Sequence, residues 1–216
     1  MMAAPNQFVA RLRPLRLPRV CVAVTASDPL EMVEKAEALV RDNTFLEFRL
    51  DYLPRPALAL ARIKQFTEYH PHVATIATCR RVANGGKFRG SLASELDILA
   101  KASAAGCQLL DLELQSALHC KRAQLERLRT RAALILSYHD FRGTKKLEET
   151  LEKMVALPAD FYKIVTTATT LHDNVLMMKF LAVRDSPVLK ASVCGSVNRA
   201  CARMNLNLPE FNCCAR

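Results

Sequence analysis

Six short apolar segments alternate with six stretches of helical apolar spacing, and this alternation restricts the possible folds more than any other feature of the chain. The apolar segments are rich in Val, Ile, Leu and Phe and cover residues 20–24, 44–51, 73–80, 109–114, 133–141 and 161–169. The helical stretches cover residues 29–41, 57–69, 91–105, 121–131, 145–156 and 171–183. Regular strand-helix repetition predicts parallel strands, in either an open doubly wound sheet or a closed eight-stranded barrel.

Capping residues support the expected helices. Asp28, Pro29 and Glu31 supply a cap, a first-turn proline and an acidic N3 residue in series. The other expected caps are Ser91, Thr144 and Thr170. These residues predict where four of the helices begin.

The second apolar segment favours the barrel over the open sheet. Its alternation places three apolar side chains on one face and three charged side chains on the other, namely Leu46, Phe48 and Leu50 against Glu47, Arg49 and Asp51. An open sheet would bury the charges against apolar helices, whereas a barrel interior can accommodate them. We therefore predict an α/β fold, a (β/α)8 barrel of the TIM type, with its chemistry at the C-terminal ends of the strands. No eighth strand is recognisable, so we expect the barrel to be incomplete at its C-terminus.

The composition predicts one globular domain with two flanking segments. Residues 20–193 would form the barrel, residues 1–19 a basic lead-in, and residues 194–216 an atypical cysteine-rich tail. The start lacks the apolar stretch of a signal peptide, and no run of eighteen apolar residues occurs, so we expect a cytoplasmic protein without a membrane partner. The eight cysteines lack zinc-site spacing and are expected to be reduced thiols.

The net charge of +10 has two readings besides nucleic-acid binding. The basic residues are scattered, aromatic residues make up 6% of the chain, and no nucleic-acid-binding motif accompanies them. A small anionic ligand explains the value as well as nucleic acid does, and excess charge on solvated faces is the interpretation that we favour. We expect a small-molecule substrate and no nucleic-acid partner.

Lys163 lies between apolar and aromatic residues in the sequence FYKIV. Burial there would disfavour the charged ammonium and leave an amine able to attack a ketone or an aldehyde. The alternative is a structural lysine that reaches solvent or pairs with Asp111 or Glu113.

His139 lies at the end of an expected strand, in the sequence SYHDF. Its imidazole can exchange protons near neutral pH. The alternatives are a structural histidine or a metal-binding pair with Asp140. Since further ligands are not apparent, we expect no metal.

A charged group on neighbouring strands could bind hydroxyl and carboxylate groups of a polar substrate. It consists of Glu47, Arg49 and Arg80, and a structural ion pair between Glu47 and Arg49 is the alternative. The glycine-containing segment 84–91 lacks phosphate-loop spacing and is interpreted as a strand-to-helix loop over the site.

Five motifs occur in order along the chain: EFRLD at 47–51, TCR followed by GG and F at 78–88, DLE at 111–113, SYHDF at 137–141 and YKIVTTAT at 162–169. Together they resemble the motifs of the type I 3-dehydroquinate dehydratases of the shikimate pathway. The resemblance implies a carbon-oxygen lyase that converts 3-dehydroquinate to 3-dehydroshikimate and water without a cofactor. It also implies a homodimer.

The resemblance assigns roles to individual residues. Lys163 would form the Schiff base, and His139 would move protons. The segment Gly-Ser-Val-Asn-Arg resembles a degenerate form of the family's arginine-bearing segment, which makes Arg199 a candidate to bind the substrate carboxylate. The pocket-lining positions would be Glu47, Arg49 and Arg80. Asn84 stands where the family commonly has an acidic residue that supports the histidine. The open alternatives are a truncated, catalytically impaired homologue and a class I aldolase-like Schiff-base enzyme.

Overall fold

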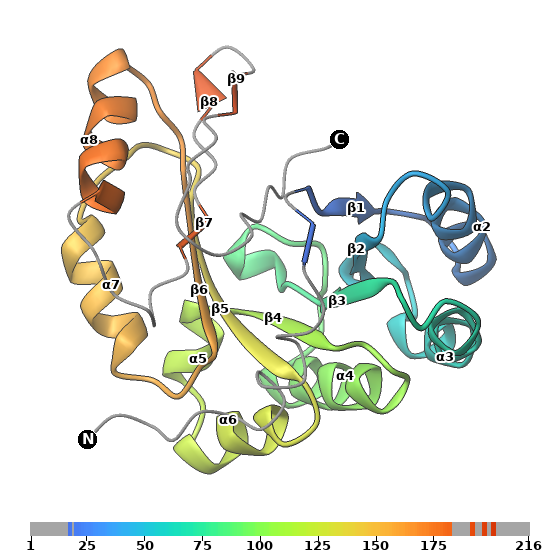
Figure 1. Ribbon diagram of the computed structural model, residues 1–216. Coiled ribbons are helices and arrows are strands. Elements are labelled where there is room, and N and C mark those ends of the chain that lie inside the picture. Colours follow the sequence, from blue (N-terminus) through green and yellow to red (C-terminus); the bar gives the residue numbers. More distant parts are fainter. Residues whose placement is uncertain (1–16, 19, 183–190, 193–195, 198–199, 202–216) are drawn as a thin grey trace.

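A parallel β-sheet in sequence order forms the centre of the protein (Figure 1). The computed structural model describes residues 17–18, 20–182, 191–192, 196–197 and 200–201. The sheet strands are β1 (Val22–Val24), β2 (Phe45–Arg49), β3 (Ala74–Thr78), β4 (Leu109–Glu113), β5 (Ala133–Asp140), β6 (Phe161–Thr166) and β7 (Ala191–Ser192). A separate antiparallel pair consists of β8 (Ser196–Val197) and β9 (Ala200–Cys201).

The helices lie on the outer side of this curled sheet (Figure 1). They are α2 (Pro29–Leu39), α3 (Leu60–Tyr69), α4 (Leu92–Ala104), α5 (Leu114–Leu118), α6 (Arg122–Arg129), α7 (Leu147–Val155) and α8 (Leu171–Ala182), with 3-10 turns at Leu50–Tyr52, Pro56–Ala59 and Val82–Asn84. All six expected strands and all six expected helices are confirmed. The parallel strands curl into part of a barrel, which confirms the expected α/β barrel class, and no pairing joins β7 to β1 within the described part of the chain. The expected absence of an eighth strand concerns segments that lie largely outside the described residues.

Two apolar clusters cover the two faces of the sheet. On the helix side, Phe48 packs edge to face against Phe66 of α3, with 5.5 Å between ring centroids. Inside the curl, side chains from the beginnings of the strands form the second cluster, which includes Phe45, Leu109 and Phe161. The interior is therefore apolar at the N-terminal ends of the strands, and its polar residues lie toward the C-terminal ends.

Three of the four expected caps make capping hydrogen bonds. The Asp28 carboxylate accepts hydrogen bonds from two backbone N–H groups of α2, and Ser91 accepts one from Ser94 in α4. Thr170 accepts one from Asp173 in α8. The prediction for Thr144 is wrong: α7 begins after Lys146, which has a left-handed φ of 52°, while the hydroxyl of Thr144 donates to Thr166.

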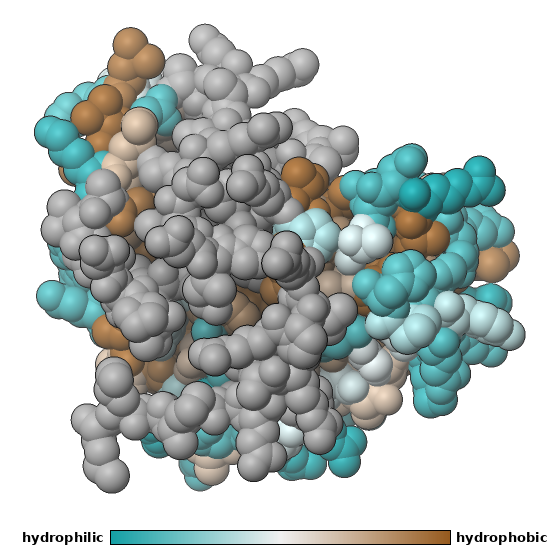
Figure 2. Space-filling model, viewed as in Figure 1, coloured by the Kyte–Doolittle hydropathy of each residue, from teal (hydrophilic) through white to brown (hydrophobic). Residues whose placement is uncertain are grey.

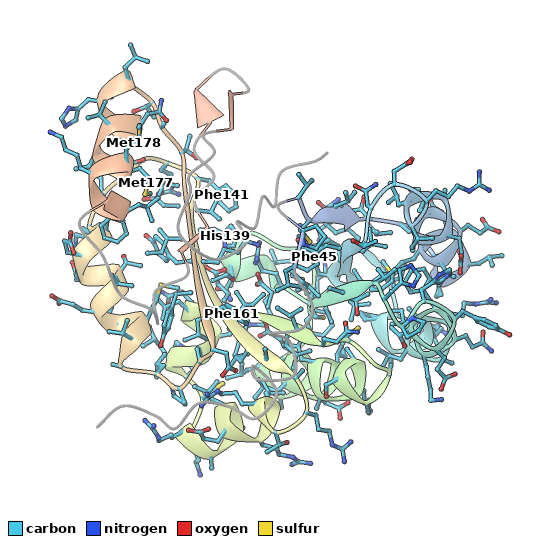
Figure 3. The ribbon with its side chains drawn as sticks, viewed as in Figure 1. Phe45, His139, Phe141, Phe161, Met177 and Met178 are labelled. Carbon is cyan, nitrogen blue, oxygen red and sulfur yellow. The ribbon has the colours of Figure 1, made fainter. Side chains whose placement is uncertain are left out.

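Helix α8 exposes apolar side chains as well as burying them. Met177, Phe180 and Leu181 are buried, while the exposed ones include Leu171 and Met178. Figure 2 shows hydrophobic atoms at the surface over this helix, and Figure 3 labels Met177 and Met178 on it. Within the described residues, no helix is both long enough and apolar enough to cross a membrane.

Candidate active site

The buried amine of Lys163 lies in an ion-pair network at the C-terminal ends of the central strands. Its Nζ is 3.3 Å from Oδ2 of Asp111 on β4. The other carboxylate oxygen of Asp111 accepts hydrogen bonds from Nη2 of Arg80 at 2.9 Å and from Oγ of Ser137 at 2.7 Å. Burial alone would raise the pKa of Asp111, but the charges of Lys163 and Arg80 outweigh it and lower that pKa well below its ordinary value. Lys163 and Arg80 therefore keep the Asp111 carboxylate ionised.

His139 belongs to the same network through Glu113, the last residue of β4. The Nδ1 atom of His139 lies 2.8 Å from Oε2 of Glu113, and the backbone N–H of His139 donates to Oε1 at 3.0 Å. Burial and the charge of Arg80 lower the pKa of His139, although its contact with Glu113 raises it in part. The imidazole is thus neutral near pH 7 and able to accept a proton.

The strand ladder explains why these side chains meet. Ser137 pairs with Glu113 on one side and with Lys163 on the other, so three polar residues occupy one level of the sheet. Residues two apart along a strand point to the same face, which places Asp111 and His139 on this face too. Figure 3 shows His139 and Phe141 near the C-terminal end of β5, and Phe161 at the N-terminal end of the neighbouring strand β6.

The other predicted pocket residues lie on β2 and just beyond β3. Glu47 is buried and accepts a hydrogen bond of 2.5 Å from the Thr78 hydroxyl. Arg49 binds both carboxylate oxygens of Asp51, at 2.9 and 2.8 Å. The structure therefore brings Arg80, Lys163 and His139 into one network, while Arg49 is engaged by Asp51. Arg199 lies outside the described residues.

The glycine-containing loop between β3 and α4 is fixed against the site by close contacts. Gly85 has a φ of +79°, and a Cβ there would lie 2.5 Å from an edge atom of the Phe141 ring. That ring stacks on His139 with 5.9 Å between centroids. Glycine at position 85 thus allows the loop to approach the residues beside the histidine.

Asn84, in the same loop, hydrogen-bonds to Ser116 of α5 and not to His139. Its Nδ2 donates to Oγ of Ser116 at 3.0 Å, and Ser116 donates to the buried carboxylate of Glu95 at 2.7 Å. Arg81 also pairs with Glu95, at 3.2 Å. This second polar cluster ties the loop to α4 and α5.

Sequence reasoning assigned no site role to three residues that the structure places centrally: Asp111, Glu113 and Ser137. The available signal was the polar face of the segments 109–114 and 133–141, combined with the DLE motif. Within the described residues, no group of three or more His, Cys, Asp or Glu side chains is arranged to hold a metal ion.

A family model described as type I 3-dehydroquinase matches residues 20–194. The chain belongs to the type I 3-dehydroquinase family. A 3-dehydroquinate dehydratase of Dehalococcoides mccartyi is 36% identical to it over 173 residues, which cover 77% of this chain and 71% of the relative. One from Coxiella burnetii is 31% identical over 174 residues, 77% of this chain and 70% of the relative.

A solved structure extends the comparison to the fold. The 3-dehydroquinate dehydratase of Geobacillus kaustophilus superposes with a TM-score of 0.72 at 22% identity, over 82% of this chain and 73% of that chain. The likeness supports the same barrel architecture for this chain. The five sequence motifs therefore identified the family correctly.

Removing the central carboxylate should destabilise the fold. Asp111→Asn would leave Lys163 and Arg80 buried without their shared anion, so we expect the free energy of unfolding to fall by about 3 kcal/mol in urea denaturation. Asp97→Asn is the matched control, because Asp97 pairs with Lys101 where both side chains are 57% exposed. Its loss should be under about 1 kcal/mol. Equal losses in the two variants would contradict this prediction.

The buried Glu95 should make stability depend on pH. Burial raises its pKa from 4.5 to about 7 despite the hydrogen bond from Ser116. The folded state then binds a proton that the unfolded state releases, so stability declines as pH rises from about 4.5 to about 7. Relative to Glu95→Gln, the wild type should lose about 3 kcal/mol across this window in urea titrations. If the stability of the two proteins changed in parallel with pH, the effect of burial on Glu95 would be refuted. Glu68→Gln, at an exposed site, is the control and should follow the wild-type pH dependence.

Proposed function

We propose that this chain is a 3-dehydroquinate dehydratase that works through a Schiff base on Lys163 and proton transfer by His139. The observation that supports this most is the placement of the buried Lys163 amine, at 3.3 Å from Asp111, in one network with the Glu113-bound His139. Family membership and the names of the relatives supply the substrate, 3-dehydroquinate, and the product, 3-dehydroshikimate.

The chemistry begins at the C3 ketone of the substrate. The Lys163 ammonium first releases one proton, and the resulting neutral amine attacks the carbonyl carbon to form a carbinolamine. The carbinolamine hydroxyl takes up a proton in its place and departs as water, which leaves a cationic iminium. A proton leaves C2 for His139, and the electron pair of that C–H bond moves toward the iminium as an enamine. The enamine expels the C1 hydroxyl, which takes the proton from His139 and departs as water on the same face. Hydrolysis of the iminium releases the product and restores the amine.

The electrostatics of the site suit these steps. An iminium at Lys163 is again a cation, and it would lie beside the Asp111 carboxylate that now pairs with the ammonium. His139 has a lowered pKa and can accept the C2 proton without first losing its own. Since the iminium itself is the electron sink, we propose that the reaction requires no metal and no organic cofactor.

Binding of the polar substrate is proposed for the charged residues around the network. Arg80, Arg49 and Glu47 offer donors and an acceptor for hydroxyl and carboxylate groups. Arg199 remains a candidate for the substrate carboxylate. A homodimer and a cytoplasmic location also remain predictions, and light scattering after size exclusion tests the first.

Trapping the Schiff base tests the proposal directly. The purified protein is incubated with 3-dehydroquinate and borohydride, the mass of the Lys163 peptide is measured, and the conjugated enone of the product is followed by absorbance. A reduced adduct on Lys163 together with enone formation is expected. An adduct without turnover would favour the impaired-homologue alternative, and folded protein without any adduct would reject the Schiff base.

A further inference from the structure

We infer that Glu113 is the residue that positions His139, so that the Nε2 atom of the imidazole is the one that exchanges protons with substrate. This inference deepens the proposed function and rests on it for the identity of the reaction. The geometry does not depend on the proposed function, because each carboxylate oxygen of Glu113 contacts His139 directly.

The two carboxylate oxygens of Glu113 contact different parts of His139. Oε1 accepts the backbone N–H at 3.0 Å, and Oε2 lies 2.8 Å from the ring nitrogen Nδ1. The first contact fixes the main chain near the end of β5, and the second fixes the rotation of the ring. A carboxylate can only accept, so the proton of the neutral ring belongs on Nδ1. Nε2 then carries the free lone pair.

Two neighbouring groups hold the Glu113 carboxylate in the position from which it contacts His139. The Oγ of Ser137 lies 3.1 Å from Oε2, and the Nε of Arg80 lies 3.4 Å from the same oxygen. Glu113 is 4% exposed, so solvent competes little for these contacts. One buried carboxylate thereby links a cation of the proposed substrate pocket to the proposed proton carrier.

The glycine loop supplies no such partner in this chain. The amide of Asn84 donates to Ser116, whose hydroxyl donates to Glu95. The carboxylate that orients His139 thus comes from the end of β4, and the loop residue serves the neighbouring polar cluster.

The tautomer of His139 is the property that tests this inference. In protein labelled with 15N at histidine, long-range ring correlations distinguish protonated from unprotonated nitrogens above the pKa of the ring. We expect wild-type His139 to carry its proton on Nδ1. In Glu113→Ala the preference should be lost in favour of the Nε2–H form, which is the commoner one in free histidine. Wild-type protein with the proton on Nε2 would overturn the inference whether or not any variant folds.

Control variants separate Glu113 from its surroundings. Glu95→Gln alters another buried carboxylate, and Asn84→Ala removes the loop amide; both should leave the His139 tautomer unchanged. Glu113→Gln keeps an oxygen that can accept the backbone N–H of His139 but loses the negative charge. It should therefore disturb the orientation and tautomer of the His139 imidazole more than the His139 backbone. A tautomer shift in Asn84→Ala with none in Glu113→Ala would assign the role to the loop instead.

Kinetics provide the second measurement. In Glu113→Gln we expect kcat to fall about 10-fold to 100-fold, less than the loss of a general acid-base group itself, with little change in KM. The borohydride adduct on Lys163 should still form, since this variant leaves the Lys163 amine and its pair with Asp111 unchanged. Absence of the adduct in the wild type would defeat the proposed function alone, because the tautomer result decides the role of Glu113 independently. An unchanged kcat in a Glu113→Gln variant would argue against the positioning role.

Discussion

Lys163→Ala is expected to abolish both the borohydride adduct and turnover, with kcat reduced by about 10⁴-fold or more. The physical reason is that alanine has no nucleophile, so the cationic iminium that draws electrons from C2 cannot form. The fold should survive, because Asp111 retains its 2.9 Å hydrogen bond from Arg80 and its 2.7 Å bond from Ser137. Mass spectrometry of the trapped protein and the enone absorbance check the prediction.

Lys101→Ala is the matched control for this experiment. Lys101 also pairs with an aspartate, Asp97 at 2.6 Å, but on the exposed face of α4. This variant should retain the adduct and the wild-type rate. An adduct that persists in Lys163→Ala would show that another amine is modified and would remove Lys163 from the mechanism.

His139→Ala is expected to lower kcat by about 10²-fold to 10⁴-fold while KM changes much less. The imidazole is needed to take the C2 proton and to return it to the departing hydroxyl, whereas the charged residues of the pocket remain. The adduct on Lys163 should therefore still be trapped. Steady-state kinetics and the trapping experiment, carried out on the same preparation, measure the two effects.

The matched control is His70→Ala. His70 forms a histidine-glutamate pair of the same length, 2.8 Å, with Glu37 on the outer helices. Its replacement should leave kcat unchanged. If His139→Ala turned over substrate at the wild-type rate, the proton-transfer role would be wrong, even with Lys163 confirmed as the nucleophile.

The outcome at Asn84 illustrates a limit of motif reasoning. The sequence indicated that a supporting carboxylate for His139 was missing from the glycine loop. The structure places the Glu113 carboxylate 2.8 Å from the same imidazole. Since Glu113 and His139 are 26 residues apart in the chain, their contact depends on the pairing of β4 with β5. A motif read position by position does not contain that contact.

Capping gives a smaller example of the same limit. Asp28 and Ser91 were recognised as caps because they directly precede apolar helical patterns, and the structure confirms both. Thr144 had the same local appearance. Its hydroxyl instead donates to Thr166 on β6, which is 22 residues away, and α7 begins later. A tertiary hydrogen bond took precedence over the local preference.

The sequence by itself determined the order of strands and helices, the face of the second strand on which the charged side chains lie, and the family. These properties follow from side-chain alternation and helical spacing, which are local features of the backbone. Only the tertiary structure decided which carboxylate meets which nitrogen: Asp111 with Lys163 and Arg80, and Glu113 with His139. Those contacts join different strands, so they depend on strand register and on the curl of the sheet, and both arise only when distant segments pair.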